Sequence, residues 1–133
     1  MAEFLRLFHR YSYIYKSKFG GEWFSAQEKW CLSDTEILKA IACEHPKFIL
    51  GTRAAKASRF AVLDIDAGSK YHNSKSLEKL VATLSAAGLK ESRLYRSSFS
   101  GGWHLYIFFE EPISSNDLRR QLVRLLELSG FTV

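Results

Sequence analysis

Two aspartates and a histidine stand on apolar segments of this sequence and could hold a metal ion or a phosphate. Asp64 and Asp66 end the apolar run that begins at Phe60, and His104 follows the turn sequence Ser100-Gly101-Gly102. Residues two apart in a strand share a face and lie roughly 6.5 to 7 Å apart along the chain. Both carboxylates can therefore face one or two divalent ions. This spacing predicts metal-assisted chemistry on a phosphate.

The turn before His104 is rich in serine and glycine, which suits contact with an anion. Gly101 and Gly102 let backbone N–H groups approach an anion closely, because glycine has no Cβ. The imidazole of His104 can donate a hydrogen bond to a triphosphate oxygen. Each of these features alone is more often structural. Their joint occurrence, in this order and on apolar strands, favours a phosphate-binding site.

Composition indicates a folded chain with a basic surface. The 133 residues are 47% hydrophobic and 25% charged, as in globular proteins, and suffice for one domain with one core. The net charge of +5 favours a polyanionic partner. The N-terminus does not resemble a signal peptide, and no apolar stretch approaches the ~20 residues that span a bilayer. We therefore expect a cytoplasmic protein with no membrane partner.

The N-terminal module, residues 1–57, is predicted to contain two helices and a strand. Apolar residues recur at helical spacing between residues 4 and 15, and the capping box Ser33-Asp34-Thr35-Glu36 begins a second helix. Residues 47–53 are expected to form a strand and residues 54–58 a loop. We expect the cysteines to be reduced and, with most aromatic side chains of the module, to lie in the core: Tyr11, Tyr13, Tyr15, Trp23, Trp30, Cys31 and Cys43.

Residues 58–133 alternate between strand and helix patterns. Strands are predicted at 59–66, 93–98 and 102–110, with Pro112 ending the third, and helices around 77–84 and 118–126. Residues 131–133 have the composition of a strand that begins where the chain stops. This order is that of a split βαβ core, the ferredoxin-like arrangement also used by RNA-recognition (RRM) domains. The predicted fold class is α+β, as one domain over residues 1–133.

The topology of such a core brings the motifs together. A right-handed crossover makes the first two strands parallel, and the hairpin around residues 99–101 sends the third strand back between them. Asp64 and Asp66, at the exit of the first strand, then lie beside His104, at the entrance of the third. The outer edge of the acidic strand is expected to be unpaired.

This constellation resembles the archaeo-eukaryotic primase superfamily, which includes the primase-polymerases. Its members carry an acidic motif on a central strand, matched here by Val62-Leu63-Asp64-Ile65-Asp66. They also carry a serine- and glycine-rich turn that ends in histidine on an apolar strand, matched by residues 98–109. The resemblance covers residues 47–133. It implies a DNA primase/polymerase-type nucleotidyltransferase core that adds nucleotides along a template with two divalent ions, Mg²⁺ or Mn²⁺.

The resemblance also implies roles for particular residues. Asp64 and Asp66 would bind the metal ions and, with His104, form the catalytic set. The implied nucleotide site comprises Arg96, Ser98, Ser100, Gly101, Gly102 and His104. The implied partners are a nucleoside triphosphate and a single-stranded template, DNA or alternatively RNA, with fused or associated replication or helicase domains.

A basic cluster before the acidic strand is a separate candidate for nucleic-acid binding. Arg53, Lys56 and Arg59 surround the predicted loop and could steer a template or a triphosphate. A basic loop is as often only solvated surface, so both interpretations of this cluster stay open.

Two departures from the family pattern bear on activity. The strict Ser-x-His spacing would place serine at position 102, where this chain has glycine, and the family's third acidic motif does not occur before Val133. We expect from this a core that stops short of the complete site and is inactive alone. Deoxy- or ribonucleotide preference, and priming or extension, stay open.

Two other functional classes remain as alternatives. A non-catalytic nucleic-acid-binding module of the RRM kind would display paired aromatics on its central strands, and the acids here would repel a phosphate backbone without metal. A replication-initiator protein needs two histidines flanking one hydrophobic residue on a strand. Here His104-Leu105-Tyr106 supplies only one.

Overall fold

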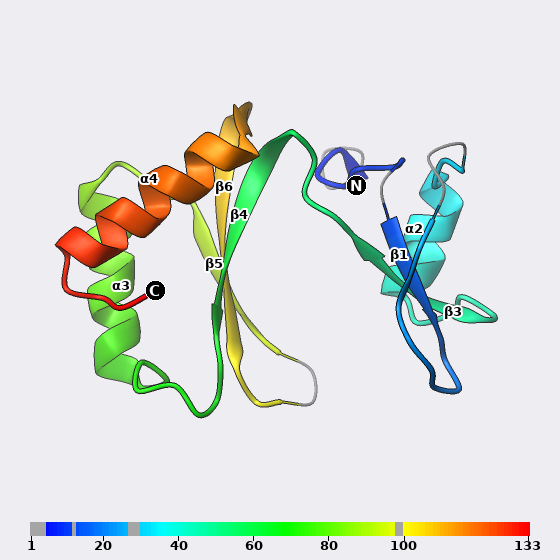
Figure 1. Ribbon diagram of the computed structural model, residues 1–133, viewed down its shortest axis with the longest axis horizontal. Coiled ribbons are helices and arrows are strands. Elements are labelled where there is room, and N and C mark those ends of the chain that lie inside the picture. Colours follow the sequence, from blue (N-terminus) through cyan, green and yellow to red (C-terminus); the bar gives the residue numbers. More distant parts are fainter. Residues whose placement is uncertain (1–4, 12, 27–29, 98–99) are drawn as a thin grey trace. The chain divides into compact units, whose positions relative to one another are not determined.

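The computed structural model describes residues 5–11, 13–26, 30–97 and 100–133. The chain divides into two compact units, Met1–Lys56 and Ala57–Val133, and each is considered by itself. Each unit contains a three-stranded antiparallel sheet, and the described residues include three helices, so the fold class is α+β (Figure 1). None of the described helices is long and apolar enough to cross a membrane.

The first unit contains the strands β1 (Tyr13–Ser17), β2 (Phe24–Ser25) and β3 (Phe48–Thr52) in the order β2-β1-β3. The helix predicted between residues 4 and 15 is therefore wrong: of the described residues in this range only Leu5 is helical, residues 6–11 form turns, bends and irregular structure, and β1 begins at Tyr13. Tyr13 and Tyr15 lie two apart on the central strand, where backbone pairing on both sides and the strand preference of aromatic and β-branched residues outweigh an apparent helical spacing. The predicted strand at residues 47–53 is confirmed as β3.

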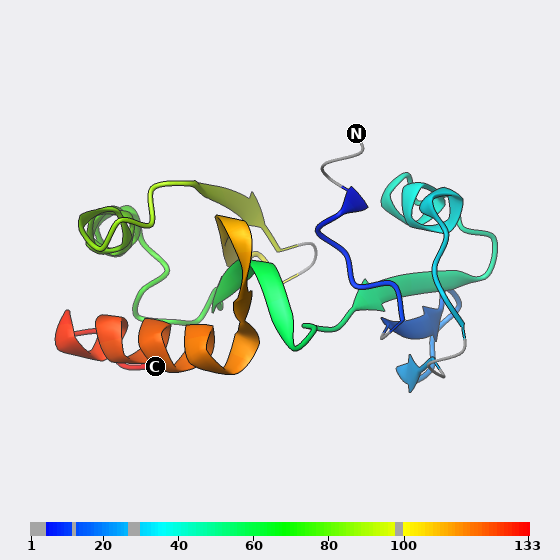
Figure 2. The ribbon, with the colours of Figure 1, turned by 90° about the horizontal axis from the view of Figure 1, so that it is seen from above.

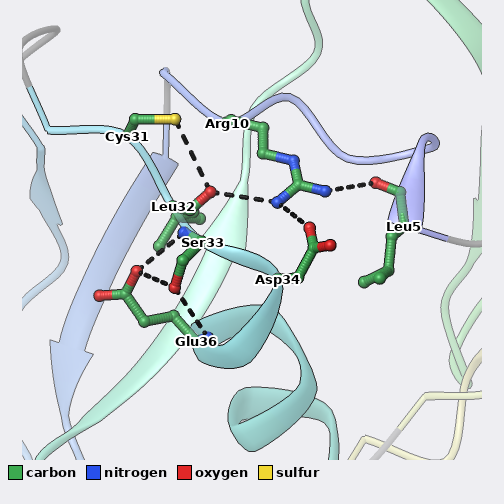
Figure 3. Close-up of polar contacts among 7 residues, drawn as sticks. All are labelled: Leu5, Arg10, Cys31, Leu32, Ser33, Asp34 and Glu36. Atoms are coloured by element: carbon green, nitrogen blue, oxygen red, sulfur yellow. Dashed lines mark hydrogen bonds and ion pairs between the residues drawn. The ribbon is translucent and has the colours of Figure 1, made fainter. Parts of the chain in front are cut away.

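The helix α2 (Asp34–Ile41) begins at the predicted capping box. The Ser33 hydroxyl oxygen accepts a hydrogen bond from the Glu36 N–H, and the Glu36 carboxylate accepts one from the Ser33 N–H at 2.8 Å (Figure 3). These bonds satisfy backbone donors that a helix start leaves unpaired. The Ser33 N–H stabilises the carboxylate and so lowers the pKa of Glu36.

Arg10 connects three segments of this unit (Figure 3). Its guanidinium donates to the carbonyl oxygens of Leu5 and Leu32, at 3.3 and 3.2 Å. It also forms an ion pair with Asp34 at 2.6 Å, in the first turn of α2. The Arg10 side chain therefore links the N-terminal segment to the helix start.

Most of the aromatic and cysteine side chains expected in the core of this unit are not buried. Its buried cluster consists of Leu5, Tyr13, Leu32 and Ile37. A small sheet with one described helix covers too little surface to bury more. The expectation of a core position is confirmed for Tyr13, but the following side chains are exposed: Tyr11, Trp23, Trp30, Cys31 and Cys43.

The second unit contains β4 (Ala57–Ile65), α3 (Ser74–Ala86), β5 (Ser92–Arg96), β6 (Trp103–Ser114) and α4 (Ser115–Leu128). The strand order is β4-β6-β5, and β6 is antiparallel to both neighbours. The predicted hairpin and the central position of the third strand are thus confirmed. Figure 1 shows both helices on the same side of this sheet, and Figure 2 shows the same unit from above.

The helices cover the face that carries the odd-numbered residues of β4 and β6. Leu84, Leu105 and Ile107 are the most deeply buried side chains there. They pack with leucines from α3 and α4 in one cluster. The alternation of strands therefore places Asp64 and His104, both even-numbered, on the face without helices.

β6 extends through Pro112 to Ser114, whereas the sequence predicted that this proline ends the strand. Phe60 lies opposite Phe108 and Ser58 lies opposite Ile113, so the register shifts between these two pairs. Pro112 falls in the interrupted stretch, where no ladder hydrogen bond is required of the proline nitrogen.

The strand expected to begin at Phe131 is absent from the described C-terminal residues. The Phe131 side chain instead packs into the buried cluster beneath α3 and α4, with its ring 5.3 Å from that of Tyr71. β4 has β6 on one side and no described strand on the other, as expected for the acidic strand.

Candidate metal and nucleotide site

Asp64 and His104 lie directly opposite each other on the neighbouring strands β4 and β6. The His104 Nε2 atom is 3.4 Å from the Asp64 Oδ1 atom. The Asp64 side chain is 66% exposed and the His104 side chain 34% exposed, so both remain accessible to a ligand. The prediction that the acidic strand and His104 meet at one end of the sheet is confirmed for this pair.

Asp66 directly follows β4, and its backbone is held by two contacts. The Asp66 carbonyl oxygen accepts a hydrogen bond from the Ser69 N–H at 2.9 Å, which closes a turn. Gly102 lies so close that a Cβ there would be 2.8 Å from the Ile65 carbonyl oxygen and 3.4 Å from the Asp66 Cα. Only glycine allows this approach. Gly102 thus packs against the chain's own backbone, and a hydrogen bond from its N–H to the Ser100 hydroxyl is long, at 3.4 Å.

The turn between β5 and β6 is closed by its own hydrogen bonds. The Ser97 N–H donates to the Gly102 carbonyl oxygen at 2.8 Å, and the Ser100 hydroxyl donates to that of Ser97 at 2.9 Å. Gly101 has a φ of 72°, in the left-handed region that favours glycine. Ser98, which was assigned to the nucleotide site, lies outside the described residues. Ser100 is exposed and close to this end of the sheet.

His72 is a contact of this turn that the sequence did not predict. Its Nε2 atom lies 3.0 Å from the Gly101 carbonyl oxygen, and its ring centroid lies 4.0 Å from that of Trp103. The segment before α3 is thereby attached to the turn. No local sequence pattern identifies this contact, because it depends on how that segment folds back onto the sheet.

The basic candidates do not gather on the face that carries Asp64 and His104. Arg96 lies at the same end of the sheet, opposite Trp103, but strand alternation places it on the other face from His104. Arg59 lies toward the opposite end of β4, where it donates to the Glu110 carbonyl oxygen and forms an ion pair with Glu111 at 3.5 Å. Its side chain is thus engaged by the chain's own groups.

The other two basic candidates belong to the first unit. The Arg53 guanidinium donates to the Ser25 hydroxyl at 2.6 Å, and Lys56 is exposed. Their proposed contact with nucleic acid remains a prediction.

A largely apolar cavity of about 270 Å³ lies beside the outer edge of β4. It is lined by residues 62–65 of β4, by Tyr71, Ser76, Leu80 and Leu126, and by residues 131–133.

The Tyr71 hydroxyl oxygen accepts a hydrogen bond from the Thr132 N–H at 2.7 Å. Mainly because of its hydrogen bonds with Thr132, the pKa of Tyr71 is lowered to about 8.

A cluster of aromatic side chains shares the open face of the sheet with Asp64 and His104. Tyr106 lies at its centre, with ring centroids 5.8 Å from Phe60, 5.3 Å from Tyr95 and 6.1 Å from Phe108. Sequence reasoning missed this cluster. The pattern that could have revealed it is the alternation of His104, Tyr106 and Phe108 along one strand.

The side chains at this end of the sheet offer oxygen donors of a kind that divalent metal ions accept. Among the described residues no group of three or more His, Cys, Asp or Glu side chains could hold a metal ion. Mg²⁺, however, is often bound through only one or two carboxylates, with substrate phosphates and water completing its coordination. Asp64 and Asp66 supply carboxylate oxygens of the kind that Mg²⁺ and Mn²⁺ prefer.

No protein-family model matches this chain, and the search of curated proteins finds no match. The functional conclusion therefore depends on the residues and their geometry.

Proposed function

We propose that this chain is the nucleotide-binding core of a DNA primase/polymerase-type nucleotidyltransferase of the archaeo-eukaryotic primase kind. The observation that supports this best is the pair formed by Asp64 and His104, 3.4 Å apart on adjacent strands and next to a glycine-rich turn. The order β4-α3-β5-β6-α4, with β6 between β4 and β5, also agrees with the split βαβ core of that family.

Each residue of the pair then has a defined task. The carboxylates of Asp64 and Asp66 would hold divalent ions, which when bound neutralise phosphate charge and help to activate the attacking hydroxyl. The imidazole of His104 would donate a hydrogen bond to a triphosphate oxygen. The Asp64 Oδ1 atom, 3.4 Å from the His104 Nε2 atom, would help to hold that imidazole in place.

Calorimetric titration with dATP tests this assignment. Because the protein alone supplies few ligands, the chain should bind dATP more tightly with Mn²⁺ than with EDTA. Asp64→Asn combined with Asp66→Asn should abolish this difference. The matched control is Asp117→Asn, which removes an exposed acid on α4 that is paired with Arg120. Equal binding with Mn²⁺ and EDTA, or no loss in the double variant, would contradict the proposal.

His104→Leu removes the N–H donors of the ring and so separates the phosphate contact from the metal contact. A hydrogen bond to a charged group contributes about 1.5–3 kcal/mol, so the variant should bind dATP with Mn²⁺ about tenfold more weakly or worse. His72→Leu is the matched control, because His72 contacts the backbone of the same turn without lying beside Asp64. An equal effect of both variants would point to a general loss of turn structure.

A further inference from the structure

The aromatic platform, defined as Phe60, Tyr95, Tyr106 and Phe108, has the geometry of a surface on which bases stack. The ring planes of Phe60 and Phe108 are inclined to that of Tyr106 by only 29° and 19°. The ring of Tyr95 meets that of Tyr106 edge-on, at 82°. Nearly parallel aromatic rings offer π faces that any nucleobase can stack on, whatever its sequence.

Nothing within the second unit covers this platform among the residues that the structure describes. Both helices of the unit pack on the opposite face of the sheet (Figure 1). Tyr95 is 49% exposed and neighbouring Val62 is 39% exposed, whereas Phe60, Tyr106 and Phe108 are half-buried. Exposed apolar surface of this kind is characteristic of binding sites.

The charges around the platform favour a polyanion over an apolar protein surface. Arg93 lies opposite Tyr106 in the sheet register, is exposed, and takes part in none of the ion pairs found among the described residues. The second unit by itself holds 10 Lys and Arg against 8 Asp and Glu, a net charge of +2. A cation beside stacked aromatic rings is the combination with which proteins hold single-stranded nucleic acids.

We propose that the aromatic platform binds unpaired bases of single-stranded DNA, with Arg93 contacting the phosphate backbone. This inference deepens the proposed function. It rests on that function only where the bound DNA strand is identified as a template. Tyr106 follows His104 by two residues, so the two side chains lie roughly 6.5 to 7 Å apart along β6. A base stacked on Tyr106 would therefore lie next to the proposed nucleotide site.

Fluorescence anisotropy with a labelled oligothymidylate tests this, in EDTA and without any triphosphate. Tyr106→Leu removes the central ring, and a lost base stack should weaken binding roughly 5- to 150-fold. Tyr106→Phe keeps the ring and should bind as the parent chain does. Leu94→Ala is the matched control, because Leu94 lies on β5 with its side chain on the opposite face and is 43% exposed. Thermal unfolding confirms that each variant is folded.

The same assay separates this inference from the proposed function. Asp64→Asn with Asp66→Asn should bind oligothymidylate at least as tightly as the parent chain, since no metal is present and two negative charges are removed. A chain that shows no Mn²⁺-dependent dATP binding but loses oligothymidylate affinity in Tyr106→Leu would disprove only the proposed function. Unchanged affinity for oligothymidylate in Tyr106→Leu would overturn the inference. It would also be overturned if the parent chain self-associates and Tyr106→Leu converts it to a monomer, because the platform would then be a contact between copies of the chain.

Discussion

Replacing Gly102 with alanine tests how closely the two strands that carry the site approach each other. An added Cβ would lie 2.8 Å from the Ile65 carbonyl oxygen and 3.4 Å from the Asp66 Cα. Both neighbours are backbone atoms, so neither can rotate away as a side-chain terminus would. The start of β6 must therefore move away from the end of β4.

The expected cost follows from the size of this overlap. Extra atoms forced into packed structure typically cost about 1–3 kcal/mol. Because the turn after Asp66 can shift somewhat, we expect about 1–2 kcal/mol. A loss of about 1 kcal/mol lowers the melting temperature of a 60–100-residue domain by roughly 4–8 °C. The second unit should therefore melt roughly 5–15 °C lower, as followed by circular dichroism.

Two other glycines provide controls for this change. A Cβ at Gly68 would meet nothing within 4 Å, so Gly68→Ala should leave the melting temperature nearly unchanged. Gly101 also has space but a φ of +72°, so Gly101→Ala should cost about 1–2 kcal/mol through backbone strain alone. In addition, Gly102→Ala should weaken Mn²⁺-dependent dATP binding, because Asp66 moves with the strand end. If Gly102→Ala melts like Gly68→Ala, the close approach of β6 to the backbone around Asp66 is wrong.

Three further predictions concern other parts of the chain. Tyr71 has a pKa of about 8, against roughly 10 when unfolded. The free energy of unfolding of the second unit should therefore increase as pH rises from about 8 to about 10, and this increment should be lost again as pH falls through about 8. Urea unfolding of Tyr71→Phe should lack this increment. Its persistence in Tyr71→Phe would contradict the role of Tyr71. Ser33→Ala should destabilise the first unit by about 0.5–2 kcal/mol in thermal unfolding, because α2 loses its N-cap, whereas an unchanged melting temperature would show that this cap is dispensable. Leu84→Ala should cost about 2–5 kcal/mol in urea unfolding, because the side chain is fully buried, and a cost below about 1 kcal/mol would show a loosely packed core.

The contact between Asp64 and His104 could be predicted because two simple patterns determine it. Apolar alternation places each residue on a strand, and the split βαβ order places those strands side by side. The same alternation also put Tyr106 on the face of His104. The aromatic platform was nevertheless missed, because the alternation was used only to predict the strand, and the aromatic residues on the face of His104 were given no separate role.

Other features depend on partners that are remote in sequence. Tyr11 and Tyr15 fit a helical spacing, whereas Tyr13 and Tyr15 fit an alternating one, and only the pairing of Tyr13–Ser17 with two neighbouring strands decides between them. The engagement of Arg59 by Glu110 and Glu111 requires the shifted register between β4 and β6, which no local pattern predicts. The same register shift lets Pro112 lie within β6, so the prediction that this proline ends the strand was wrong.

A metal–triphosphate complex is proposed to bind at the Asp64 end of β4. Paramagnetic broadening of backbone amide resonances by Mn²⁺ in the presence of dATP locates that complex directly. Residues 64–66 and 102–104 should be broadened first, and Asp64→Asn with Asp66→Asn should remove the effect. Broadening that is centred elsewhere in the chain, or that persists unchanged in the double variant, would contradict this proposal.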